Sequence, residues 1–177
     1  TIESVLGHQP GERITWHAEA IRYFEALAEA APDRISVATY AQSWEGRNLV
    51  YAVVSSAENM QRIDEIKTNM QRLADPRQTS RSEAQEIIRN QPAVTWLSYG
   101  VHGNEISSTE AAMLTAYHLL ASRGDERVAR LGGRGGGGRR TGQVAERTRR
   151  VRGRHGGVAR AVSNGLRRTG RPGRCVR

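Results

Sequence analysis

The 177-residue sequence has one cysteine, one phenylalanine and no long apolar run. The lone Cys175 excludes an intrachain disulfide and leaves the redox compartment open. A membrane-spanning helix needs about 18 consecutive apolar residues, so the sequence predicts no membrane span. The chain starts at Thr1 and shows no signal peptide, a start that we expect of a processed or trimmed chain.

Acidic side chains are almost absent from the last part of the chain. Residues 132–177 hold 14 Arg and 13 Gly but a single acid, Glu146, and no Phe, Tyr or Trp. Residues 1–131 hold 13 Lys and Arg against 17 Asp and Glu, the composition of a mildly acidic globular domain. An Arg/Gly segment buries too little apolar surface to offset its chain entropy. The sequence therefore predicts one domain, 1–131, and a disordered Arg/Gly-rich tail, 132–177.

Helical and strand-like patterns alternate along residues 1–131, which favours an α/β fold. The predicted helices cover residues 16–27 with Thr15 as the N-cap, 58–73 and 82–89, and the predicted strands cover 35–40, 49–54 and 93–97. Ser43 to Arg47 predicts a turn between the first two strands. The strand 93–97 has little charge, so we expect it in the centre of the sheet. Sites in such folds lie at the carboxyl ends of strands.

The segment His102-Gly103-Asn104-Glu105 lies at such a carboxyl end. An imidazole and a carboxylate three residues apart can both reach one Zn²⁺, and Gly103 lets the backbone turn tightly enough for both to face one point. Ser107 to Glu110 predicts a capping box, so that the next helix follows the loop at once. The pattern indicates His102 and Glu105 as zinc ligands held between two buried elements. The alternative is that they are unrelated polar residues of a loop.

At these motifs the sequence resembles the amino-terminal half of a zinc carboxypeptidase of the carboxypeptidase A class. The likeness runs from about Gly11 to Arg130 and lies in two motifs with matching order and spacing, Ser43-Trp44-Glu45-Gly46-Arg47 and Trp96-Leu97-Ser98-Tyr99-Gly100-Val101-His102-Gly103-Asn104-Glu105. The resemblance implies an α/β/α sandwich with a mixed central sheet, truncated here after the helix that follows the second zinc ligand. It also implies a single Zn²⁺ that activates water to hydrolyse the C-terminal peptide bond of a peptide or protein. His102 and Glu105 match the first two ligands, whereas Asn104 stands where many members have a substrate-binding arginine.

The remaining groups that the resemblance requires have no match in this sequence. Members of the family supply a third ligand, a histidine, from well downstream, a later glutamate as general base, and Arg and Asn-Arg groups for the substrate carboxylate. His8 and His17 precede the first strand, His118 lies on the helix after the loop, and His155 lies in the tail. Glu146 has no context for a general base. The catalytic and substrate-binding residues are therefore unknown, and we expect the chain as given to be an inactive, incomplete domain.

The tail composition favours a frameshift near Leu131 in a G+C-rich gene. The four glycines 135–138 would be GGN codons, and GGT repeats read one base later become GTG, which encodes valine. On a permissible codon set, residues 133–151 then give a valine run followed by Asp, and a Pro-Asn-Gly-Arg segment follows. The resemblance would place a valine-rich strand and a Pro-Asp-Gly-Arg-like motif here. Reading the DNA across codons 125–140 tests the hypothesis.

Two alternative functions stay open. The same loop resembles that of aspartoacylase-like zinc deacylases of N-acyl amino acids, although the turn 43–47 and the long amino-terminal helix favour the peptidase. The 14 tail arginines attract phosphate, but without aromatic residues for stacking they predict only salt-sensitive, non-specific nucleic-acid binding. The resemblance suggests a secreted or periplasmic protein. An incomplete sheet leaves an apolar edge open, so we expect poor solubility and weak zinc binding.

Overall fold

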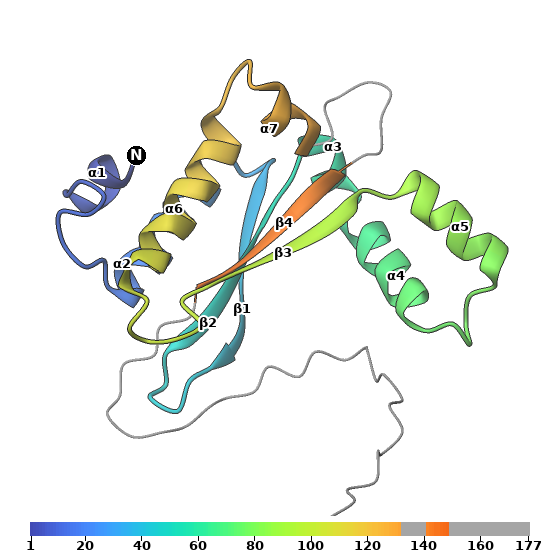
Figure 1. Ribbon diagram of the computed structural model, residues 1–177, viewed down its shortest axis with the longest axis horizontal. Coiled ribbons are helices and arrows are strands. Elements are labelled where there is room, and N and C mark those ends of the chain that lie inside the picture. The colour runs from blue at the N-terminus through green and yellow to red at the C-terminus, as the bar shows by residue number, and fades with distance from the viewer. Residues whose placement is uncertain (132–140, 149–177) are drawn as a thin grey trace, which may run out of the picture.

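The computed structural model describes residues 1–131 and the backbone of residues 141–148. Its elements in chain order are α1 (Ile2–Leu6), α2 (His17–Ala30), β1 (Ile35–Gln42), β2 (Asn48–Val54), α3 (Ala57–Gln61), α4 (Ile63–Ala74), α5 (Arg81–Asn90), β3 (Ala93–Tyr99), α6 (Ile106–Ala121), α7 (Glu126–Leu131) and β4 (Thr141–Thr148) (Figure 1). Helices and strands alternate as the sequence predicts, and the α/β class is confirmed. No helix in this described part has the length and apolar character needed to cross a bilayer.

The sheet is mixed. Its four described strands lie in the order β1-β2-β4-β3; β4 pairs antiparallel with β2 and parallel with β3, and β1 pairs antiparallel with β2. It follows that β3 and β1 run in the same direction. The carboxyl end of β3, where the sequence places the zinc loop, therefore shares one edge of the sheet with the turn between β1 and β2.

Strand β4 lies inside the segment that the sequence predicts to be a tail. Its main chain is paired on both sides. The pairing with β2 runs from Val50↔Thr148 to Val54↔Val144, and the pairing with β3 runs from Ala93↔Thr141 to Tyr99↔Thr148. Residues 132–140 and 149–177, with Cys175, His155 and most of the predicted frameshifted stretch, lie outside the described residues. The domain boundary at residue 131 and the frameshift stay predictions.

The expectation that β3 is a central strand is wrong for the described part of the sheet, in which β3 pairs with β4 alone. Leu97 and Tyr99 pack against the core, whereas Val94 and Trp96 are 36% and 55% exposed. Lack of charge indicates that one face of a strand is buried. It does not indicate how many neighbours the strand has.

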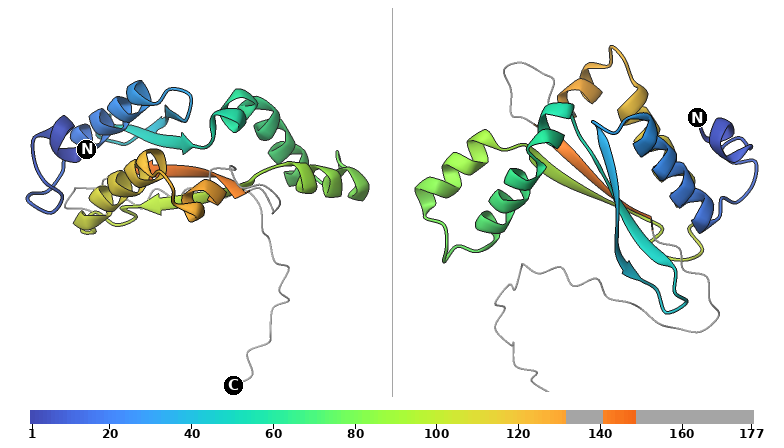
Figure 2. Two further views of the ribbon diagram at one scale, coloured as in Figure 1. Left: turned by 90° about the horizontal axis from the view of Figure 1, so that it is seen from above. Right: turned by 180° about the vertical axis from the view of Figure 1, so that it is seen from behind.

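The core lies between the sheet and helices α2 and α6. These two helices lie on one side of the sheet, and α4 and α5 lie on the other (Figures 1 and 2). The helical residues of the core recur at intervals of three and four, which places them on one face of each helix. They are Ala20, Tyr23, Phe24 and Leu27 of α2 and Ala112, Met113, Ala116 and Leu119 of α6. Ile35, Ala52 and Val54 face them from the strands.

The side chain of Tyr23 is fully buried in this core and contacts Phe24 edge to face, with the ring centroids 6.2 Å apart. Burial raises the pKa of its hydroxyl to about 12. The hydroxyl has no hydrogen-bond partner among the residues that the structure describes. A buried polar group in this state lowers the stability of the fold.

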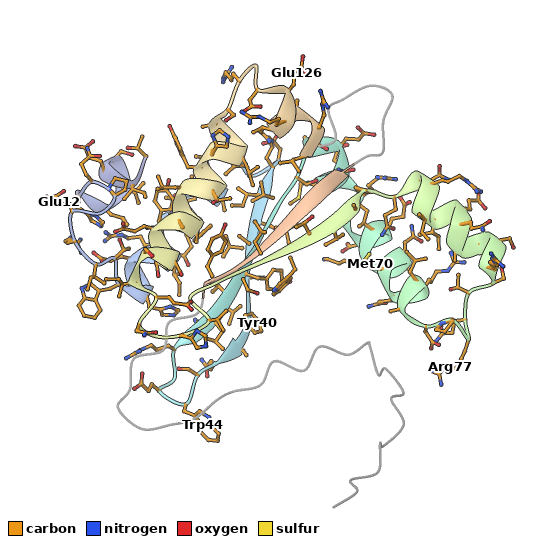
Figure 3. The ribbon with its side chains drawn as sticks, viewed as in Figure 1. Glu12, Tyr40, Trp44, Met70, Arg77 and Glu126 are labelled. Atoms are coloured by element: carbon orange, nitrogen blue, oxygen red, sulfur yellow. The ribbon has the colours of Figure 1, made fainter. Side chains whose placement is uncertain are left out.

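The turn between β1 and β2 is held by its own backbone, as the sequence predicts. The Ser43 amide donates to the Arg47 carbonyl at 2.8 Å and the Gly46 amide donates to the Ser43 carbonyl at 2.9 Å. Gly46 has φ 72°, a left-handed conformation that strongly favours glycine. Trp44 at the tip of this hairpin is 99% exposed (Figure 3).

Arg34, just before β1, joins the sheet to the carboxyl end of α6. Its guanidinium donates to the carbonyls of Leu120 at 3.0 Å, Leu119 at 3.2 Å and Ser55 at 3.3 Å. The last carbonyls of a helix have no partner within the helix and carry the negative end of its dipole. The arginine satisfies two of them and fixes one end of α6, whose other end follows the predicted zinc loop.

Candidate metal centre

The loop between β3 and α6 is formed by a tight reversal of the chain after the last strand residue. Gly100 has φ 61°, and α6 starts at Ile106 with Glu105 as its N-cap residue. The capping box predicted from Ser107 to Glu110 is therefore wrong, because these residues lie inside the helix. The expected placement of the loop is nevertheless confirmed: both candidate ligands lie between the end of a strand and the start of a helix.

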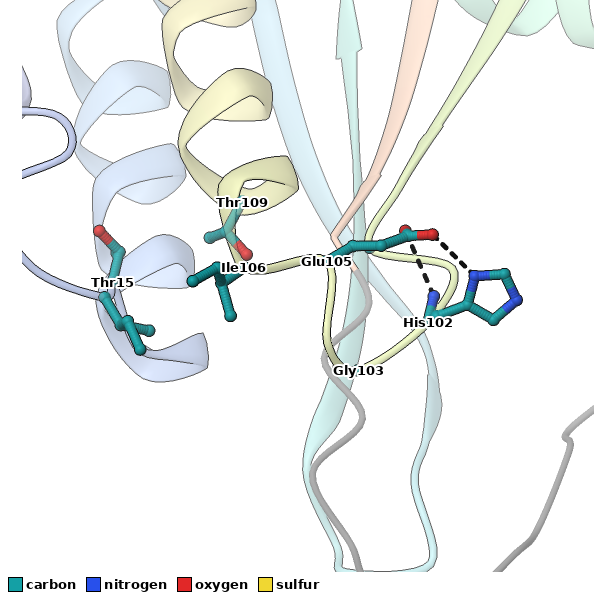
Figure 4. Close-up of a pocket in the computed structure, with 8 residues that line it drawn as sticks. Thr15, His102, Gly103, Glu105, Ile106 and Thr109 are labelled. Carbon is teal, nitrogen blue, oxygen red and sulfur yellow. Dashed lines mark hydrogen bonds and ion pairs between the residues drawn. The ribbon is translucent and has the colours of Figure 1, made fainter.

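His102 and Glu105 face one another across this loop (Figure 4). The Nδ1 atom of the imidazole lies 2.7 Å from Oε1 of the carboxylate, and the His102 amide donates to Oε2 at 3.3 Å. The Glu105 amide donates in turn to the His102 carbonyl at 3.2 Å. The side chains are 73% and 40% exposed, so a solute can reach both. The structure thus brings together the two side chains that the sequence selects.

The carboxylate of Glu105 is held in its charged form by its partner. The hydrogen bond from the His102 ring, and after it the bond from the His102 amide, lower the pKa of Glu105 below its usual range. A carboxylate ligand must be ionised to bind a metal. Glu105 therefore meets this requirement near neutral pH.

The pair matches part of a zinc site in donor chemistry and nearly matches it in spacing. Zn²⁺ takes histidine nitrogen and carboxylate oxygen at about 2.0–2.2 Å with tetrahedral angles, which separates two such donors by about 3.4 Å. Nδ1 and Oε1 are 2.7 Å apart because they share a hydrogen. A metal ion would displace that hydrogen, and the two side chains would move apart by about 0.7 Å. His102 and Glu105 thus have the donor atoms, and nearly the spacing, of two zinc ligands.

The other predicted or considered residues do not join the pair. Among the side chains that the structure describes, no group of three or more His, Cys, Asp or Glu could hold a metal ion. His8 and His17 are buried, with ring nitrogens at 3.0 Å from the Gln9 carbonyl and 2.8 Å from the Asn48 carbonyl. His118 lies at the far end of α6, 3.1 Å from Ser122. These three histidines therefore supply neither a third ligand nor a general base to the loop.

A cavity of about 20 Å³ adjoins the pair. This volume has room for about one water molecule. The residues around it come from three segments and are Ile14 and Thr15, then Gly100, His102, Gly103 and Glu105, then Ile106 and Thr109 (Figure 4). The first two belong to the stretch before α2. The loop therefore has a wall built from a part of the chain far away in sequence.

Glu110 connects this distant wall to α6, and sequence reasoning missed it. Its Oε2 accepts from the Gly11 amide at 2.7 Å and its Oε1 accepts from the Thr15 hydroxyl at 3.1 Å. Thr15 was expected as the N-cap of α2, but α2 starts at His17, and the Trp16 amide is capped by Glu19 at 2.8 Å. Because these partners are 99 and 95 positions from Glu110, no local pattern could have indicated them.

The comparison with known protein families agrees with the geometry of the loop. A histidine and a glutamate converge between the end of a strand and the start of a helix, and both are residue types that bind zinc. The family model of zinc carboxypeptidases matches residues 20–132, more than half of the chain and both motifs singled out in the sequence. The chain belongs to the zinc carboxypeptidase family. No curated protein matches it.

Proposed function

We propose that this chain carries the first two ligands of a carboxypeptidase zinc centre, His102 and Glu105, in an incomplete form of the domain. The observation that carries the proposal is the convergence of the two side chains at 2.7 Å in the loop that the family motif occupies. The family indicates a zinc-dependent hydrolase. The finer activity that we propose is hydrolysis of the C-terminal peptide bond of a peptide or protein.

Each residue has a separate task in this proposal. Bound Zn²⁺ lowers the pKa of a water ligand and polarises a substrate carbonyl. His102 would hold the ion through its ring nitrogen and Glu105 through its carboxylate, which the low pKa keeps ionised. The hydrogen bond from the His102 amide to Oε2 orients the carboxylate. Gly100, with φ 61°, rather than the expected Gly103, takes the left-handed conformation that turns the chain after β3.

Titration of the full chain with Zn²⁺ by isothermal calorimetry tests the ligand pair. With two protein ligands we expect affinity far below that of a structural site with four, and we expect it to vanish in His102→Ala and in Glu105→Gln. His118→Ala is the matched control, because this histidine is similarly exposed, at 62%, and lies away from the loop. Binding that survives His102→Ala, or a wild-type chain that binds no zinc at all, would overturn the proposal.

The same chain should turn over neither a peptide nor an N-acyl amino acid. Hydrolysis also requires a third ligand and a proton-transfer group, and the described residues bring neither to the loop. Zinc-dependent release of a C-terminal amino acid would show that residues outside the described part complete the centre. Release of an acyl group from an N-acyl amino acid would instead favour the deacylase.

A further inference from the structure

Residues 8–15, which we name the N-terminal segment, contact the start of α6 through hydrogen bonds to Glu110, one of them partly buried. Thr15 is 3% exposed, and its hydroxyl donates to Oε1 of Glu110. Nε2 of His8, itself 3% exposed, lies 3.5 Å from the same Thr15 oxygen. A buried hydroxyl that loses its acceptor destabilises its surroundings, so the bond to Glu110 stabilises the position of Thr15.

Glu110 accepts from two points of the N-terminal segment at once. The bond from the Gly11 amide, at 2.7 Å, holds the middle of the segment, and the bond from Thr15 holds its end. The other carboxylate contacts of the segment lead elsewhere: Glu12 accepts from the Gln9 amide, within the segment, and Glu19 of α2 binds Arg13. Both hydrogen bonds that join the segment to α6 therefore end on the Glu110 carboxylate.

The attached segment forms one wall of the cavity beside the candidate ligands. Ile14 and Thr15 face that cavity together with His102 and Glu105. Glu110 is five residues beyond Glu105, in the second turn of the helix that Glu105 caps. The two bonds to Glu110 thus set how closely the wall approaches the loop. If they break, we expect the wall to withdraw and the side chain of Glu105 to gain conformations in which it does not face His102.

We propose that Glu110 is a positioning residue of the zinc loop: through Gly11 and Thr15 it fixes the N-terminal segment against α6 and so restricts Glu105 to the orientation that a metal requires. This inference rests on the proposed function of His102 and Glu105. Residues that support metal ligands from behind change metal affinity by about 10–100-fold when they are replaced. Because Glu110 acts through a neighbouring segment, we expect the lower end of that range, about tenfold.

Two measurements on the full chain test the proposal with Glu110→Gln, which keeps the shape of the side chain but replaces one acceptor oxygen by a donor. Calorimetric titration with Zn²⁺ should show affinity lowered about tenfold. Amide hydrogen exchange without metal should be faster at Gly11 and also at His102 and Glu105. Glu12→Gln is the matched control and should change neither the affinity nor the exchange at the loop, because its carboxylate binds only within the segment.

The exchange measurement separates this proposal from the proposed function. If the wild-type chain binds no zinc, the ligand pair fails, and exchange at His102 and Glu105 still decides whether Glu110 orders the loop. Faster exchange at Gly11 with unchanged exchange at the loop would overturn the positioning role, and so would zinc affinity within twofold of the wild type. If Glu110→Gln does not fold, Thr15→Val removes one of the two bonds and keeps the side-chain volume, and it should show the same changes to a smaller extent.

Discussion

Replacing Arg34 by alanine removes three hydrogen bonds that tie the start of β1 to the carboxyl end of α6. The three acceptors, the carbonyls of Leu119, Leu120 and Ser55, lie 3.0–3.3 Å from guanidinium nitrogens. A hydrogen bond to a charged group contributes about 1.5–3 kcal/mol, so three would give several kcal/mol if every acceptor were left dry. A cavity of about 370 Å³ adjoins Arg34 beside α7 and the loop that joins it to α6, and water in it can reach the freed carbonyls. We therefore expect Arg34→Ala to lower the free energy of unfolding by about 2–3 kcal/mol.

Urea unfolding followed by circular dichroism measures this loss. Arg34→Lys should recover about half of it, because an ammonium can satisfy one helix-end carbonyl but not all three acceptors. Arg127→Ala is the control: this side chain is 90% exposed and should change stability by less than about 0.5 kcal/mol. Zinc affinity should stay unchanged in Arg34→Ala, because the 16 residues of α6 separate the arginine from the loop by about 24 Å. A loss below about 0.5 kcal/mol would refute the view that Arg34 anchors this helix.

Two further predictions concern single groups. Tyr23→Phe removes a buried hydroxyl that has no partner among the described residues. The free energy of unfolding should therefore stay the same or rise by up to about 1 kcal/mol. A loss of more than about 1 kcal/mol in urea unfolding would show that the hydroxyl is bonded. The second concerns acid. The hydrogen bond from Arg13 lowers the pKa of Glu19 from 4.5 to about 2, so its contribution to stability is complete above about pH 4.5 and is lost as the pH falls toward 2. Glu19→Gln should therefore show a shallower decrease of the urea midpoint over that range, and curves of equal slope would contradict the assignment.

The parts of the fold that could be predicted from the sequence are those set by neighbours along the chain. The spacing of Ala20, Tyr23, Phe24 and Leu27 predicts the buried face of α2. The strand patterns predict β1, β2 and β3 to within a few residues at each end. The single helix expected over residues 58–73 is broken at Arg62, with φ −114° and ψ 26°, where its side chain reaches the Asn90 carbonyl at 3.2 Å. That partner is 28 positions away and leaves no periodic mark in the sequence.

In the candidate site, too, the contacts between neighbours along the chain could be predicted and the long-range contacts could not. His102 and Glu105 could be paired in advance because they are three positions apart in one loop, and their distance depends on the local backbone. Thr15 and Glu110 were both assigned as capping residues of separate helices, and both assignments fail for one reason. The two side chains bind each other instead, and this contact exists only after the chain has folded back on itself. A third ligand from a distant segment is likewise not readable from spacing.

The bonds from Gly11 and Thr15 to Glu110 also restrict the order of folding during synthesis. A ribosome adds about 5–20 residues per second, so the 99 positions between Gly11 and Glu110 take about 5–20 s to make. For that time the Thr15 hydroxyl lacks the Glu110 carboxylate, and the N-terminal segment stays in water while β1 and β2 can already pair. A stretch made before β1 thus reaches its final place after β1 can pair, and the zinc loop acquires its wall only when the helix beyond it has emerged.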